Sequence, residues 1–168
     1  MLWYFSIYFY NLSSSCNCDK NTESFLGSVK RKKGDFKGAI EDYTSAIKLK
    51  GDYYIAYNNR GSAKLDNGDI KGAMDDFSKA IQLNPKYAFA YNNRAITKYK
   101  QKDYKGSIED CSKAIELDPS NGYAFLNRGI AKEMLRDDSG ACSDWMKAIE
   151  LGVENAKNYS GDCKMSNL

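Results

Sequence analysis

The sequence contains no histidine, which removes much of the catalytic chemistry open to a chain of 168 residues. Mechanisms that use an imidazole base, a Ser/His or Cys/His nucleophile pair, or a histidine-bound metal are excluded. Acidic and hydroxyl side chains are present, but no motif arranges them for catalysis. The sequence therefore predicts a protein that is not an enzyme and that uses no cofactor or metal.

Amide side chains, in contrast, recur at a fixed spacing. Asn59, Asn93 and Asn127 stand 34 residues apart, and Asn58 and Asn92 directly precede two of them. An amide carries both a donor and an acceptor, so an evenly spaced row can satisfy the N–H and C=O groups of an extended peptide without reading its side chains. The alternative is that these amides bond neighbouring helices to one another.

The amides belong to a repeat that is written twice between residues 54 and 121. The segment AYNNR at 56–60 recurs at 90–94, SKAI at 78–81 recurs at 112–115, and 16 of 34 aligned pairs are identical by direct count. A fixed period of this length indicates stacked supersecondary units. Three positions keep the period throughout: Gly27, Gly61, Ala95 and Gly129; Ala46, Ala80, Ala114 and Ala148; and the larger Tyr43, Phe77, Cys111 and Trp145.

The small residue of the first half-unit, the large residue between alanines of the second, and the closing Pro85 and Pro119 resemble the tetratricopeptide-repeat family. The resemblance implies an all-α, right-handed superhelical solenoid of about four helix-turn-helix units and a short C-terminal helix. The expected parts are a leader and linker at 1–19, units at 20–53, 54–87, 88–121 and 122–155, and a C-terminal tail at 156–168. The chain departs from the pattern at Glu23, where other units have an aromatic residue, and at Gly51 and Val153, which replace proline.

In this family the first helices line the concave face, where the array binds its partner. The amide row at Asn59, Asn93 and Asn127 resembles the asparagine ladder in the superhelix of O-linked N-acetylglucosamine transferase, although Phe25 takes this place in unit one. The residues expected around the ladder are Asn58, Asn92, Ile55, Phe89, Tyr123, Ile96, Tyr99 and Ile130. We expect Phe89 and Tyr123 to be aromatic anchors, and the alternative for them is ordinary packing between first helices.

These features predict a non-enzymatic adaptor that holds an extended segment of another protein. The alternative is a structural module that associates with itself end to end. Cochaperones of the family grip a terminal carboxylate with lysine and arginine, and such a clamp is missing from this sequence. The corresponding places hold Asn58, Ser62, Asn93, Tyr123 and Asn127. Binding of a heat-shock chaperone tail is therefore not expected.

Charge argues against a nucleic-acid partner. The chain has 25 basic and 22 acidic residues, a formal net charge of only +3, whereas nucleic-acid proteins normally carry a strongly basic surface. The run Lys30-Arg31-Lys32-Lys33 falls at the expected end of the first helix, where cations favour the helix dipole. A solvated helix end explains this run, and the alternative is attraction to an anionic membrane surface.

The first twelve residues carry no charge, and they are fewer than the roughly 20 apolar residues that span a bilayer. They resemble the apolar core of a signal peptide without its basic start. Cys16 follows three serines and faintly resembles a lipidation site of a bacterial lipoprotein. A disordered or surface-lying tail is the alternative. We expect an exported or membrane-attached protein, with a cytoplasmic location as the alternative.

The end of the array, with Cys142, Trp145 and Cys163, resembles the closing unit of exported bacterial repeat proteins. This resemblance implies that a short helix from about Val153 to Ser160 folds back and brings Cys163 beside Cys142, so that a disulfide can form. Two free thiols in a reducing cytosol are the alternative. Cys111 occupies the large packed position and is expected to be buried.

Two further expectations concern the helices. In unit two, a helix from about Tyr54 to Asp66 should precede one from about Ile70 to Leu83, with Asp69 as the N-cap. The matching caps are Asp35, Asp103 and Asp137. The repeated arginines are expected to form ion pairs with the preceding unit: Arg60 with Asp42, Arg94 with Asp76, and Arg128 with Asp110.

Overall fold

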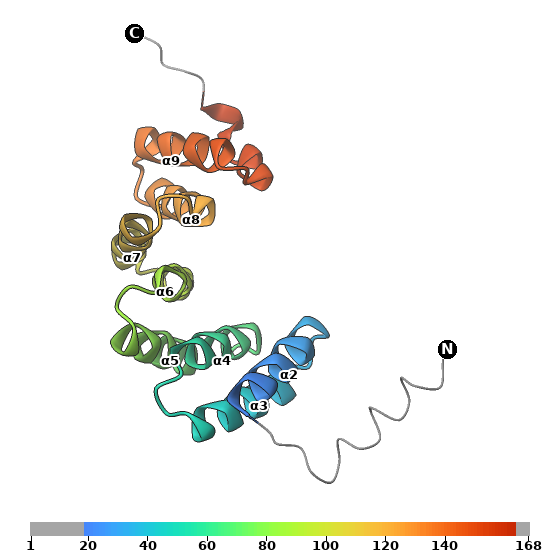
Figure 1. The fold of residues 1–168 in the computed structure, drawn as a ribbon. Helices are drawn as coiled ribbons and strands as arrows, with labels where there is room; N and C mark the ends of the chain where they lie inside the picture. The colour runs from blue at the N-terminus through green and yellow to red at the C-terminus, as the bar shows by residue number, and fades with distance from the viewer. Residues whose placement is uncertain (1–18, 164–168) are drawn as a thin grey trace.

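The computed structural model describes residues 19–163, and within that range the chain is all-α, as the sequence predicts. Eight α-helices form four successive pairs, and two short 3₁₀ helices follow them (Figure 1). The elements are α2 (Lys20–Lys32), α3 (Phe36–Leu49), α4 (Tyr54–Asp66), α5 (Ile70–Leu83), α6 (Ala88–Lys100), α7 (Tyr104–Leu117), α8 (Gly122–Glu133), α9 (Asp138–Glu150), η2 (Glu154–Asn158) and η3 (Ser160–Asp162). Helices α4 and α5 have the bounds that the sequence predicts for unit two.

An aspartate precedes the second helix of every pair and caps it. The carboxylate of Asp69, for example, accepts a hydrogen bond of 2.9 Å from the backbone N–H of Gly72. The matching caps are Asp35 to Gly38, Asp103 to Gly106, and Asp137 to Gly140. Each bond satisfies one of the donors that the start of a helix leaves free, so the predicted N-caps are confirmed.

Each pair is packed around one large side chain of its second helix. Tyr43, Phe77, Cys111 and Trp145 take this position, and all four are buried. The first helix approaches this side chain closely because it carries a glycine or alanine opposite it. The core is therefore a series of similar small cores, one in each unit, as expected for a repeat array.

The repeated arginines pair within their own unit, which corrects the predicted pairs with the preceding unit. The observed bidentate pairs are Arg60 with Asp76, Arg94 with Asp110, and Arg128 with Asp144, in place of the predicted Asp42, Asp76 and Asp110. The guanidinium turns toward the second helix that folds back beside it, where both carboxylate oxygens are within reach. Each arginine reaches the preceding unit only through Nη1, which donates to a hydroxyl there: Thr44 Oγ1 at 3.2 Å, Ser78 Oγ at 3.4 Å and Ser112 Oγ at 3.2 Å.

Neighbouring pairs stack so that the first helices lie side by side along the inside of a curve. Helix α4 contacts α2 and α6, and α6 contacts α8, while each first helix also packs against the second helix before it. Figure 1 shows α4, α6 and α8 on the inner side of the array and α5 and α7 on the outer side. Residues of the first helices therefore form the inner face.

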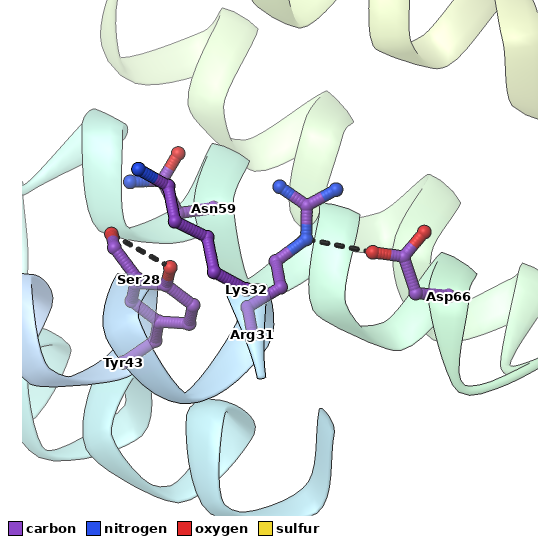
Figure 2. A pocket seen from close by; sticks show the side chains of 6 residues that line it. All are labelled: Ser28, Arg31, Lys32, Tyr43, Asn59 and Asp66. Carbon is purple, nitrogen blue, oxygen red and sulfur yellow. Dashed lines mark hydrogen bonds and ion pairs between the residues drawn. The ribbon is translucent and has the colours of Figure 1, made fainter. Parts of the chain in front are cut away.

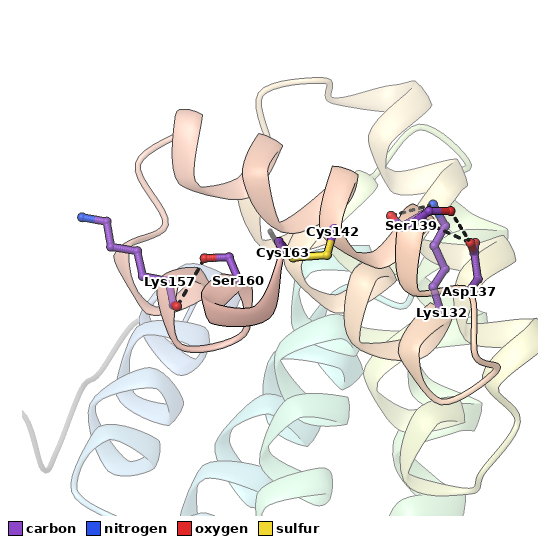
Figure 3. The surroundings of a disulfide bond; sticks show 8 residues. Lys132, Asp137, Ser139, Cys142, Lys157, Ser160 and Cys163 are labelled. Atoms are coloured by element: carbon purple, nitrogen blue, oxygen red, sulfur yellow. Dashed lines mark hydrogen bonds between the residues drawn. A yellow bond between two sulfur atoms is a disulfide. The ribbon is translucent and has the colours of Figure 1, made fainter. Parts of the chain in front are cut away.

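The C-terminal end is closed by η2 and η3, which pack against α9. The helix predicted at 153–160 is thus a 3₁₀ segment, interrupted at Tyr159. Ala156 is fully buried, and the ring of Tyr159 lies 5.6 Å from that of Trp145. A disulfide joins Cys142 of α9 to Cys163, whose Cα atoms are 5.5 Å apart (Figure 3).

Candidate peptide-binding face

The asparagine ladder lies on the inner face, and each amide is already bonded to the protein at one position. Asn93 Nδ2 donates to Asn58 Oδ1 of the preceding unit at 2.9 Å, and Asn127 Nδ2 donates to Asn92 Oδ1 at the same distance. Asn59 Oδ1 accepts from Asn58 Nδ2 at 3.2 Å. Asn93 and Asn127 therefore link neighbouring first helices, which is the alternative role given above for these amides, whereas Asn59 is bonded within its own helix.

These bonds leave capacity for a ligand. Oδ1 of Asn93 and of Asn127 accepts no hydrogen bond from any residue of 19–163, and Nδ2 of Asn59 makes none within this range. All three side chains are only half-buried. The inter-unit bonds fix the amides of Asn93 and Asn127 in one orientation, so their free acceptors are held in position before a ligand arrives.

Asn58 and Asn92 lie beneath this face instead of on it. They are 5% and 7% exposed, and their carbonyl oxygens hold the ladder residue of the following unit. The sequence places them around a bound peptide, but their burial makes them supports of the ladder. The AYNNR pattern shows that both amides repeat, yet it does not show which of two adjacent helix positions points outward.

Apolar side chains flank the ladder in the later units. Phe89 and Tyr123 are 57% and 59% exposed, so neither is buried by packing between first helices. Phe89 does contact Tyr87, with ring centroids 5.7 Å apart, and one side of its ring therefore has a partner. The other predicted residues are half-buried at the expected places on the first helices: Ile55, Ile96, Tyr99 and Ile130.

A hollow of about 400 Å³, which the repeat pattern does not predict, lies between units one and two. We call it the unit-one pocket; its lining residues are Ser28, Arg31, Lys32, Tyr43, Asn59 and Asp66 (Figure 2). Arg31 Nε donates to Asp66 across the units at 2.7 Å. The hydroxyls of Ser28 and Tyr43 are 3.0 Å apart, and burial raises the pKa of Tyr43. The sequence signal for this pocket is the Lys30-Arg31-Lys32-Lys33 run, which we assigned only to a helix end or a membrane.

The rest of the described chain has few groups that could bind a metal or act as a nucleophile. No cluster of potential metal ligands occurs within residues 19–163. Cys111 is buried, and burial raises the pKa of its thiol to about 12, so the reactive thiolate is suppressed at neutral pH. Nothing within the described range points to an enzyme.

Two predictions concern the N-terminal segment. Lipidation at Cys16 and a leader at the start of the chain both lie outside the described residues. Among the helices of residues 19–163, none is long and apolar enough to cross a membrane. Export and membrane attachment therefore stay predictions from the sequence.

Solved structures share the architecture of this chain. One MamA crystal structure is 27% identical, with a TM-score of 0.74 over 89% of this chain and 87% of its own, and another is 28% identical, with a TM-score of 0.70 over 82% and 75%. The Arabidopsis OM64 TPR domain is 27% identical, with a TM-score of 0.66 over 68% of this chain and 94% of the domain. The first TPR of Spaghetti (RPAP3), bound to the HSP90 peptide SRMEEVD, is 23% identical, with a TM-score of 0.67 over 70% of this chain and 94% of its own, and shows the shared fold.

No curated protein matches the sequence significantly. Family comparison, however, recognises the repeats directly. Residues 54–87 and 88–121 match the tetratricopeptide repeat, and residues 27–68 match a second TPR repeat description. Together these matches run from 27 to 121, more than half of the 168 residues. The chain belongs to the tetratricopeptide-repeat family.

Proposed function

We propose that this chain is a non-enzymatic adaptor that holds an extended segment of a partner protein on its inner face. The observation that carries the proposal is the pair of free carbonyl oxygens on Asn93 and Asn127, beside the exposed rings of Phe89 and Tyr123. The amide oxygens suit the N–H groups of an extended backbone, and the rings suit its apolar side chains. The first TPR of RPAP3, which has the same fold, is bound to a peptide in its solved structure.

Panning a random linear peptide library against the purified protein tests the proposal. We expect it to select peptides whose affinity falls about tenfold or more in the double variant Phe89→Ala/Tyr123→Ala, since exposed aromatic anchors carry much of such binding energy. The matched control is Leu49→Ala/Met146→Ala, which removes two side chains of similar exposure, 56% and 53%, from second helices. Failure to select any linear peptide, or an equal loss in both double variants, would refute the proposal.

Aromatic variants are preferable to alanine variants of the ladder in this experiment. Asn93→Ala and Asn127→Ala would each remove the donor to a buried carbonyl oxygen of the preceding unit. A loss of binding could then reflect a weakened contact between units. The side chains of Phe89 and Tyr123 are 57% and 59% exposed and make no hydrogen bond with any residue of 19–163, so their truncation alters the surface with less effect on the array.

End-to-end association is the second candidate, and one observation favours it. Where other units have arginine, unit one has Leu26, which is 42% exposed in the first helix of the described array. The C-terminal end opposes it, because η2 and η3 already cover part of α9. Sedimentation over a range of concentrations distinguishes the two functions: a mass that rises with concentration, and that Leu26→Lys abolishes, would support association.

A further inference from the structure

We propose that the unit-one pocket binds an anionic group of the captured peptide, while apolar side chains of the same peptide lie over units three and four. This inference rests on the proposed function, because it assigns a polarity to a peptide on the inner face. The ladder alone would contact only the peptide backbone. The side chains beside the ladder supply the selectivity that the amides lack.

Three donors in the unit-one pocket are available to an anion. Asp66 holds Arg31 through Nε, which leaves both Nη groups without an acceptor among the described residues. Lys32 forms no ion pair within residues 19–163, and Asn59 Nδ2 makes no hydrogen bond there. Figure 2 shows Lys32 extending toward Asn59, while Arg31 points toward Asp66. A guanidinium with two free Nη groups matches a carboxylate or a phosphate.

The charges around the pocket leave an excess of one positive charge. Arg31 and Lys32 are opposed only by Asp66 among the lining residues. Lys30, on the same turn, is already paired with Asp42 at 2.8 Å, and this hydrogen bond raises its pKa. Lys33 is exposed at the end of α2 and adds to the positive field. An acid can therefore enter without displacing an existing ion pair.

The inner face changes character along the array. From unit one to unit four, the place of Ser28 holds Ser28, Ser62, Ile96 and Ile130, and the place of Arg31 holds Arg31, Leu65, Tyr99 and Glu133. Hydroxyl and basic groups thus give way to apolar groups, and the last unit reverses the charge. A peptide with an acid at one end fits this face in one direction only, because Glu133 repels an acid at the other end.

The distance between the unit-one pocket and the apolar side chains of unit three sets the spacing expected in the ligand. Packed helices lie about 8–10 Å apart, so Ile96 and Tyr99 of unit three are about 20 Å from the unit-one pocket. An extended chain rises about 3.3 Å per residue. The anionic group and the main apolar residues should therefore be separated by about six residues.

Degenerate peptide libraries of about nine residues test this polarity. Each library fixes one position as Glu, phosphoserine, Gln or Lys, with amidated C-termini, and a further library carries a free C-terminal carboxylate. We expect wild-type protein to prefer an anion at one end of the peptide by about fivefold over Gln, as for a partly exposed ion pair. The three anionic forms show whether the group is a side-chain carboxylate, a phosphate or a chain terminus.

The double variant Arg31→Gln/Lys32→Gln should lose the anion preference and keep the preference for apolar residues. Its control, Lys37→Gln/Lys71→Gln, removes the same net charge from exposed positions on second helices and should behave as wild type. Peptide binding with no anion preference, or a preference that survives in the Arg31/Lys32 variant, would overturn the inference and leave the adaptor function standing. The absence of any peptide binding would instead refute the adaptor function.

Phosphatidylserine vesicles in the same buffer test whether the basic residues bind an anionic membrane surface instead of a peptide. Under the proposal, wild-type protein and the Arg31→Gln/Lys32→Gln variant should sediment equally with these vesicles. If the variant loses vesicle binding while its peptide preferences stay unchanged, the basic run serves a membrane surface and the inference is wrong.

Discussion

Gly61 lies so close to the ring of Phe77 that a Cβ added to it would stand 2.8 Å from Cε1. The same contact occurs between Gly27 and Tyr43 and between Gly129 and Trp145, at 2.9 and 2.5 Å. In unit three the large position holds the smaller Cys111, and there the first helix carries Ala95. The two positions are therefore matched in volume: a large ring stands opposite glycine, and the smaller cysteine stands opposite alanine.

We expect Gly61→Ala to lower the free energy of unfolding by about 1–3 kcal/mol, because the methyl group forces the Phe77 ring or the helix to move. An exposed helical glycine would behave oppositely, since alanine is the better helix former. Urea unfolding measures the change. The complementary test is Cys111→Phe, which should destabilise unit three and be partly rescued by Ala95→Gly. A Gly61→Ala protein more stable than wild type would contradict the close approach.

The partner of Arg94 can be identified by coupling. Arg94→Ala should cost about 2 kcal/mol, below the penalty for a fully unpaired buried charge, because Lys98 still bonds Asp110 at 2.9 Å. In double-mutant cycles, Arg94 should couple to Asp110 by about 1 kcal/mol or more and to Asp76 by less than about 0.5 kcal/mol. Stronger coupling to Asp76 would favour the inter-unit pairing predicted from sequence.

The repeat explains why the helices could be predicted and the ion pairs could not. Caps, turns and apolar positions are local, so a period of 34 residues determines them once one unit is understood. Arg60, however, has one repeated aspartate before it at Asp42 and one after it at Asp76. Both aspartates repeat with the same period, so the sequence does not distinguish them; the direction in which the Arg60 side chain points decides between them.

The candidate site also has a part that the repeat predicts and a part that it does not. The period identifies the row of Asn59, Asn93 and Asn127, but which of two adjacent amides faces outward depends on the rotation of the helix. The unit-one pocket is not periodic, because Arg31 and Asp66 are joined across 35 residues by a single side-chain contact. The basic run of residues 30–33 indicates the cations of this pocket, but no sequence pattern shows that Arg31 meets Asp66 of the next unit.

Lys102 adopts a backbone conformation that favours glycine. Its φ is 65°, and the equivalent turn positions in units one and two are Gly34 and Gly68, with φ of 82° and 86°. We expect Lys102→Gly to raise the free energy of unfolding by up to about 1 kcal/mol, because glycine adopts this conformation without the clash of a Cβ. Gly68→Ala should lower it by a similar amount. If Lys102→Gly is destabilising, contacts of the lysine stem outweigh the backbone strain.

Cys111 should make stability fall with rising pH. Burial raises the pKa of its thiol from about 9 to about 12, so above pH 9 the folded chain keeps a proton that the unfolded chain releases. The stabilisation is complete below about pH 9 and is lost as the pH rises toward 12, with a slope of at most about 1.4 kcal/mol per pH unit. Urea unfolding between pH 9 and 10 should show this slope in wild type and a flatter one in Cys111→Ala. Equal slopes would mean that the thiol already ionises in the folded state.

The disulfide should stabilise the last unit without affecting the first units. It closes a loop with a sequence separation of 21, for which the entropic contribution is about 3 kcal/mol. Because a repeat array transmits stability mainly between neighbours, reduction should speed amide exchange in α9 and η2 and leave α4 unchanged. Hydrogen exchange of the oxidised and reduced protein measures this, and Cys142→Ala should match the reduced protein under both conditions. Equal exchange in α9 with and without reductant would show that the contact of Tyr159 with Trp145 holds the end of the array by itself.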